Sequence, residues 1–265
     1  MLSTLFKYEF KNTAKVMLTV YGVLALITVL GVVLISGYAD SQDLAHTIES
    51  IFLLVYLFMY MMTILAYFLI TIIYLTVHFY KTMYASQGYL TFTLPVKPVS
   101  IFNVKLLVSA VWVFLSVVFI LLSLFSILSA IPGFMDEFYY KSLAGNSLAL
   151  YLSSIGMRRG EFIVYLIISY IILCFIAPLR LYVSCSIGQL FNQRKVTASI
   201  IIGIILFFAH NSISSSFVNL MELYREKANL LYSGTVWILL GFDLFFVILF
   251  YLGNVLIVKK HINLE

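Results

Sequence analysis

Apolar residues follow one another along this chain in long continuous blocks, and short segments between the blocks hold most of the charges. Each block has about twenty positions, which as a helix rising ~1.5 Å per residue crosses a hydrocarbon core of ~30 Å. The blocks do not alternate apolar with polar residues, which favours helices over the strands of a membrane barrel. We therefore predict six spans, near 16–36, 51–79, 105–131, 162–190, 196–216 and 235–258.

The composition points to the same class, an all-α integral membrane protein. Hydrophobic residues make up 63% of the 265 positions and charged residues 10%, too few to cover a soluble domain of this size. A signal peptide is not expected at the start, because its apolar core has about 7–15 residues and the first block is longer. The sequence contains no internal repeat and no linker, so residues 1–265 are predicted to form a single transmembrane domain.

The segment before the first span, residues 1–15, is predicted to be an amphipathic helix that lies in the membrane interface. Apolar side chains on one face would enter the lipid, while lysines on another face would reach the headgroups. A simple topology anchor is the alternative. The apolar positions are Leu2, Leu5, Phe6 and Phe10, and the lysine stripe is Lys7, Lys11 and Lys15.

The basic residues set the orientation of the spans. One set of loops, which includes both termini, carries ten lysines and arginines, and the opposite set carries five. Because loops rich in Lys and Arg stay in the cytoplasm, both termini are predicted to face the cytoplasm. An even number of spans is required for that arrangement, and six satisfies it.

The third predicted span repeats a small residue at every seventh position. Such a stripe lets another helix approach closely, so we interpret it as a packing face; the lining of a polar path is the alternative. The stripe consists of Ser109, Ser116, Ser123 and Ala130.

Charged and polar side chains inside the predicted spans are candidates for a translocation path, because a charge in the membrane is costly to insert. Arg180 lies in the inner half of the fourth span and Asp243 lies within the sixth. His210 and Asn211 make the outer end of the fifth span polar. For Arg180 the alternative is snorkelling to the inner headgroups. For Asp243 the alternatives are a hydrogen bond to a neighbouring helix or a neutral, protonated carboxyl group.

No motif for catalysis, for a cofactor or for a metal is present. The chain has no glycine-rich phosphate loop, no His-Glu-x-x-His and no Gly-x-Ser-x-Gly. Its four histidines are scattered, and its basic residues never form the long run that nucleic acid would require. We therefore expect no enzyme activity, no catalytic, cofactor or metal site in this chain, and no nucleic-acid partner.

The largest cytoplasmic segment is predicted to be 80–104, which is too short for a domain but rich in aromatic residues and proline. Such a surface is suited to docking a partner protein, or alternatively to anchoring in the interface. Its candidate contact residues are Tyr84, Gln87, Gly88, Tyr89, Phe92, Leu94 and Pro95.

Two runs of this sequence resemble the permease subunits of bacterial ABC exporters of the type-two class. The first, from Gly88 to Leu107, reads GYLTFTLPVKPVSIFNVKLL: an aromatic stretch, Thr-Leu-Pro, and a helix start with a lysine shortly after. The second, from Ser186 to Lys195, reads SIGQLFNQRK. Six spans and an interfacial N-terminal helix agree with the resemblance.

The resemblance implies a bacterial plasma-membrane protein that works with a separate ABC ATPase subunit, which binds the ATP. Two permeases, identical or related, would form the pore, and the 80–97 loop would contain the coupling helix that sits in a groove of the ATPase. Where relatives often carry an acidic residue before the Gly-Tyr pair, this chain has Gln87. The expected substrate is amphipathic or hydrophobic: an antimicrobial peptide, a drug or a lipid-like molecule.

Two other functions are compatible with the sequence. The first is a membrane sensor or scaffold that transports nothing. The second is a secondary carrier, although the inverted repeats with broken helices that would support it are not seen.

Overall fold

The computed structural model of the chain describes residues 2–39, 46–85, 88, 96–131, 133–138, 152, 157–191, 193–228 and 232–260. Within these ranges the regular structure is entirely helical, and six helices are long and apolar enough to cross a membrane. The chain is therefore a multi-span helical membrane protein, as predicted. The long helices are α1 (Leu2–Ala39), α2 (His46–Met83), α4 (Pro98–Ser129), α7 (Arg159–Gly188), α8 (Lys195–Ala228) and α9 (Tyr232–Lys260), and a short helix, α5, covers Phe134–Phe138.

Several helices extend beyond the predicted spans. The predicted interfacial segment 1–15 and the first span join into one helix, α1, because neither proline nor glycine interrupts residues 2–21. The three lysines of the N-terminal stripe are exposed along it. Likewise, α8 continues beyond the predicted end at 216 as far as Ala228. The third helix starts at Pro98 rather than 105, since proline suits the first helical position.

Contacts group the chain into two compact units, and α1, α2 and α4 contribute residues to both. Unit 1 comprises Met1–Glu9, Tyr74–Val111 and Ala149–Glu265. Unit 2 comprises Phe10–Ile73 and Trp112–Leu148. The single-domain organisation stays a prediction.

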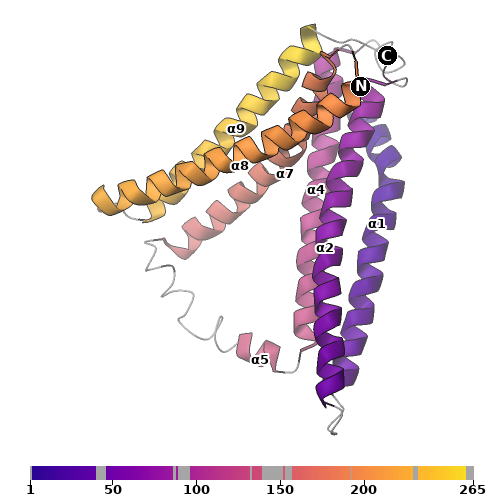
Figure 1. Cartoon of the computed structure of the whole chain (residues 1–265), viewed down its shortest axis with the longest axis vertical. Coiled ribbons are helices and arrows are strands. Elements are labelled where there is room, and N and C mark those ends of the chain that lie inside the picture. The colour runs from indigo at the N-terminus through magenta and orange to yellow at the C-terminus, as the bar shows by residue number, and fades with distance from the viewer. Residues whose placement is uncertain are drawn as a thin grey trace. The chain divides into compact units, whose positions relative to one another are not determined.

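Unit 2 contains the parts of α1, α2 and α4 that run alongside one another (Figure 1), together with α5. The serine stripe of α4 receives hydroxyl groups from both neighbouring helices. Ser116 Oγ lies 2.9 Å from the hydroxyl of Tyr21, and Ser123 Oγ lies 2.6 Å from Thr28 Oγ1 and also bonds the hydroxyl of Tyr60. In this unit the small residues therefore serve helix packing, as predicted.

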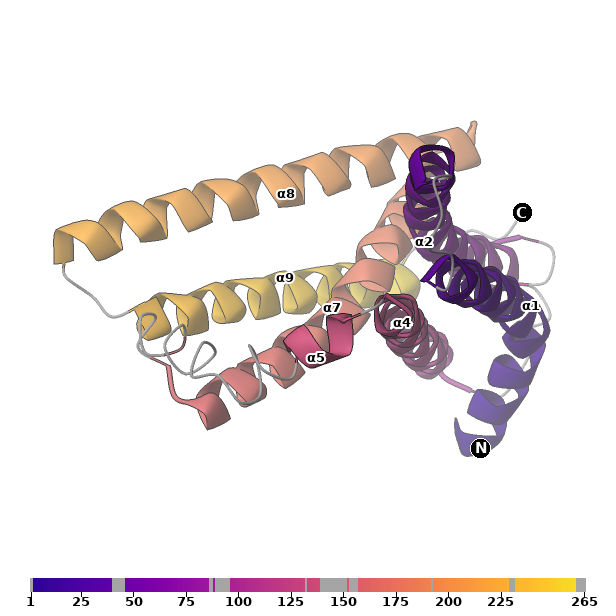
Figure 2. The ribbon, with the colours of Figure 1, turned by 90° about the horizontal axis from the view of Figure 1, so that it is seen from below.

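Unit 1 is organised around α7, along which both α8 and α9 pack more extensively than they pack on each other (Figures 1 and 2). Its core joins the end of α2 and the start of α4 to α7. The ring of Phe79 stacks on that of Tyr182 at 3.8 Å, and Phe102 meets both rings edge-on. The hydroxyl of Tyr182 bonds Ser109, the first serine of the stripe. These aromatic side chains fix the two ends of the segment 80–104 to the same core.

Candidate functional site

The predicted coupling segment begins at Tyr84, directly after α2, and this side chain is fully buried in unit 1. Its hydroxyl lies 2.8 Å from Ser186 Oγ on α7, and Ser186 donates to Asn254 Oδ1 on α9 at 2.9 Å. Burial raises the pKa of Tyr84 to about 12, so the hydroxyl stays protonated at neutral pH. Tyr84 is therefore a buried anchor, not an exposed contact residue of the loop.

Most of the predicted contact residues that follow lie outside the described part of the chain: Gln87, Tyr89, Phe92, Leu94 and Pro95. Gly88 is described. It is buried, and its N–H donates to the carbonyl of Ala85 at 2.7 Å.

The far end of the segment is also tied to unit 1, where α4 begins. The carbonyl of Lys97 accepts the N–H of Ser100 at 2.8 Å in the first turn. One turn further, Asn103 Oδ1 accepts a hydrogen bond from the hydroxyl of Tyr251 on α9 at 3.1 Å. Hydrogen bonds thus connect both ends of the segment to α9. The connection from Tyr84 runs through Ser186 of α7, and the connection from Asn103 is direct.

The second run that carries the resemblance forms the close turn between α7 and α8. A Cβ on Gly188 would lie 2.8 Å from Cα of Ser199, so only glycine fits where the two helices approach. Gln189, directly after α7, is buried, and neither atom of its amide has a hydrogen-bond partner within the described ranges. Arg194, just before α8, has a φ of 56°, which lets the chain reverse.

A cluster of charged side chains that the sequence analysis missed lies beside this segment. Glu9 Oε1 on α1 lies 2.7 Å from Nζ of Lys105 on α4 and 2.7 Å from Nε2 of His78 on α2. Lys105 is only 5% exposed. The cluster ties the start of α1 to the two helices that flank the segment 80–104. Its only sequence signal is a lone carboxylate in the lysine-rich segment 1–15.

Two of the predicted path residues lie together. Arg180 Nη1 is 3.4 Å from His210 Nδ1, and the Arg180 guanidinium lies over the ring of Phe207 at 4.6 Å. Asn211 is exposed. Asp243 is half-buried on α9 and forms neither a hydrogen bond nor an ion pair with any other described residue. The structure thus joins Arg180 to His210 but not to Asp243.

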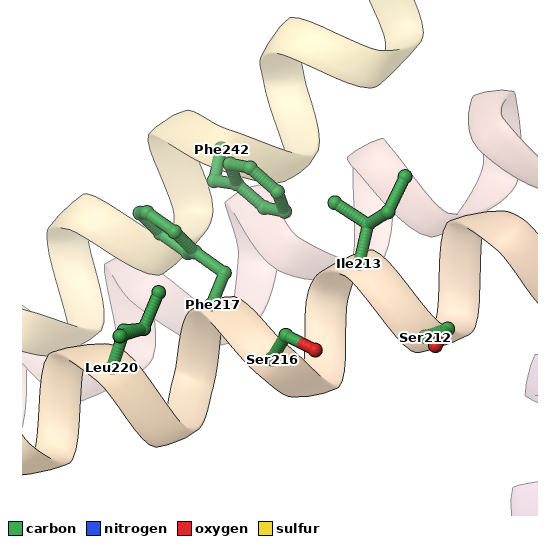
Figure 3. Close-up of a pocket in the computed structure, with 6 residues that line it drawn as sticks. All are labelled: Ser212, Ile213, Ser216, Phe217, Leu220 and Phe242. Carbon is green, nitrogen blue, oxygen red and sulfur yellow. The ribbon is translucent and has the colours of Figure 1, made fainter.

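A groove runs between α8 and α9 in the same unit and has a volume of about 260 Å³. Figure 3 shows Ile213, Phe217 and Leu220 on the side of α8 that faces α9, with Phe242 of α9 opposite them. The rings of Phe217 and Phe242 stack at 4.0 Å. Ser212 and Ser216 complete the lining, which is otherwise apolar.

Among the described residues, no three side chains of the kinds that bind metal ions come together. The chain matches no protein-family model, no curated protein and no solved structure.

Proposed function

We propose that this chain is the permease subunit of an ATP-driven ABC exporter in the bacterial plasma membrane. In this proposal both termini face the cytoplasm, residues 1–15 lie in the inner interface, and two permeases form the pore. A separate ATPase subunit binds ATP and docks on the segment 80–104. The substrates are amphipathic or hydrophobic molecules. The support from sequence is the resemblance of the runs 88–107 and 186–195.

One structural observation carries the proposal: both ends of the segment 80–104 are anchored in the core of unit 1. At the entry, Tyr84 bonds Ser186, which bonds Asn254. At the exit, Asn103, two residues before the buried Lys105, bonds Tyr251. A partner that pushes on the segment would therefore move α7 and α9 with it, as a coupling element requires. A loop that served only as a surface anchor would not need buried attachments at both ends.

The orientation is tested first, on the chain alone. Ser86→Cys places a thiol in the segment, and the native thiols Cys174 and Cys185 are buried, which keeps the background low. We expect a membrane-impermeant maleimide to label this cysteine only after the cells are opened. Labelling from outside intact cells would contradict the proposal.

The coupling role is tested with an ATPase subunit encoded beside this chain that has a phosphate-binding loop. Phe92→Ala removes an aromatic anchor of the kind that contributes about 2 kcal/mol or more at an interface, so co-purification should fall at least tenfold. Tyr8→Ala is the matched control, because Tyr8 is an exposed aromatic residue of α1 outside the segment. Equal co-purification of both variants would refute the coupling role, and a neighbouring kinase that binds in place of an ATPase would favour the sensor.

A further inference from the structure

Arg180 places a positive charge within α7, in a stretch apolar enough to span the membrane. The ion pairs found among the described residues both involve Glu9, so no described carboxylate neutralises Arg180. Its contacts are the ring of Phe207 and one nitrogen of His210. A charge in an apolar environment is costly unless it is paired, so an anion from outside the chain would stabilise this site.

The nitrogen atoms of Arg180 and His210 that remain without a partner are donors. The guanidinium of Arg180 can only donate, so Nδ1 of His210 must accept from it and the proton of a neutral imidazole must then sit on Nε2. Nε of Arg180 and Nε2 of His210 are both buried without a hydrogen-bond partner among the described residues. His210 is 9% exposed, whereas Arg180 is half-buried and reaches the surface of the unit. Two unused N–H donors beside a cation match the oxygen atoms of an anionic group.

The apolar groove between α8 and α9 lies further along α8, on the helix face that carries His210. His210, Ile213, Phe217 and Leu220 follow one another at helical spacing, so they share one face of α8. Leu220 lies about 15 Å along the helix from His210, at ~1.5 Å per residue. Phe246 connects the two regions, since its ring lies 4.6 Å from that of His210 and 5.1 Å from that of Phe242 in the groove. Figure 3 shows the groove end of this face.

We infer that unit 1 binds an anionic amphiphile, a phosphate-headed lipid-like molecule. Its headgroup oxygens accept hydrogen bonds from Arg180 and His210, and its alkyl chain lies in the groove lined by Ile213, Phe217 and Leu220. The groove lining contains no carboxylate, since Asp243, which follows Phe242 in sequence, does not line it. The inference concerns binding and does not depend on an ATPase partner.

The test uses the purified full-length chain in an uncharged detergent, with lipid binding measured by native mass spectrometry. We expect dioleoyl phosphatidic acid to bind at least tenfold more tightly than dioleoyl phosphatidylcholine, whose headgroup has no net charge. Arg180→Gln should weaken binding of the phosphatidic acid at least tenfold, as loss of a charge-assisted hydrogen bond does. Arg180→Lys should retain part of the affinity. Arg159→Gln, an exposed arginine at the start of the same helix, should change nothing.

The groove is tested separately from the headgroup site. Leu220→Trp fills the groove and should weaken phosphatidic acid binding, while Leu252→Trp, on an exposed position of α9 outside the groove, should not. Inorganic phosphate alone should compete only weakly. The inference is overturned if both lipids bind equally, if Arg180→Gln and Arg180→Lys each bind as the unaltered chain does, or if phosphate competes as strongly as the lipid. If the glutamine variant does not fold, the lysine and Leu220→Trp variants decide the question.

Discussion

The replacement Glu9→Gln tests the charged cluster at the start of α1. It keeps the size of the side chain and one accepting oxygen, but it replaces the other oxygen with an NH₂ group and so removes the negative charge between Lys105 and His78. Lys105 then remains almost fully buried with no carboxylate in contact, because the ion pairs found among the described residues both use Glu9. The α1 helix offers no other acid, since Glu9 is the only acidic residue in Leu2–Ala39.

The distance in the structure sets the size of the effect. Two opposite charges 2.7 Å apart attract each other by about 6 kcal/mol at an effective dielectric constant of ~20. Desolvation of both groups offsets much of this gain, so the intact pair contributes little net stability. Removing one partner leaves the desolvation cost of the other uncompensated, and the expected loss is about 3–5 kcal/mol. Removing both, in Glu9→Gln with Lys105→Met, should restore most of that loss.

Unfolding of the purified chain by dodecyl sulfate in mixed micelles, followed by far-UV circular dichroism, measures these differences. Glu222→Gln is the control, because this carboxyl group is exposed on α8 and its loss should cost less than about 0.5 kcal/mol. The double variant is decisive. If its loss of stability equals the sum of the losses of the two single variants, the two charges do not interact and the clustering of Glu9 with Lys105 is refuted.

Two further predictions concern the turn after α7 and the entry to the segment 80–104, and the same unfolding measurement checks both. Gly188→Ala should destabilise the chain by about 1–3 kcal/mol, because the added carbon would press on the backbone of Ser199. The control Gly241→Ala, with open space around it, should be neutral or stabilising by up to about 1 kcal/mol. Similar losses of stability in both variants would contradict the close approach of Gly188 to Ser199. Tyr84→Phe should cost about 1–2 kcal/mol, because the buried hydroxyl of Ser186 loses one of its partners. A cost below about 0.5 kcal/mol would mean that this hydrogen bond does not anchor the segment.

The six long apolar helices of the described part of the chain follow from the sequence, because the membrane requires apolar blocks of a defined length. The ends of the helices do not follow in the same way, since hydropathy marks where a helix leaves the lipid and not where its hydrogen bonding stops. The α4 helix begins at Pro98 in a polar segment, and α8 continues through a serine-rich stretch to Ala228. Both extensions lack an internal proline or glycine, so nothing in the backbone ends them earlier.

The candidate site was less predictable, because its contacts join residues far apart in the chain. Spacing within a helix indicates which residues share a face but not which helix lies opposite. Glu9 therefore gave no sign of pairing with Lys105, 96 residues away. Arg180 was identified as a costly charge, but its position beside His210 depends on how α7 and α8 pack. Tyr84 was predicted to contact a partner protein. It is buried instead, and its hydroxyl forms a hydrogen bond with Ser186 on α7.

Most polar groups within the apolar helices find a partner inside the protein. Each serine of the α4 stripe, at positions 109, 116 and 123, bonds a tyrosine hydroxyl from α7, α1 or α2. Because lipid offers no replacement for water, such pairing is what lets these groups be buried at all. Arg180 departs from this rule, since its charge has no described counter-ion and two buried N–H donors of its site have no described acceptor. The serine stripe of α4 is satisfied internally, whereas Arg180 is a cation without a described counter-ion near an apolar groove, which favours a ligand over structural packing as the reason for the charge.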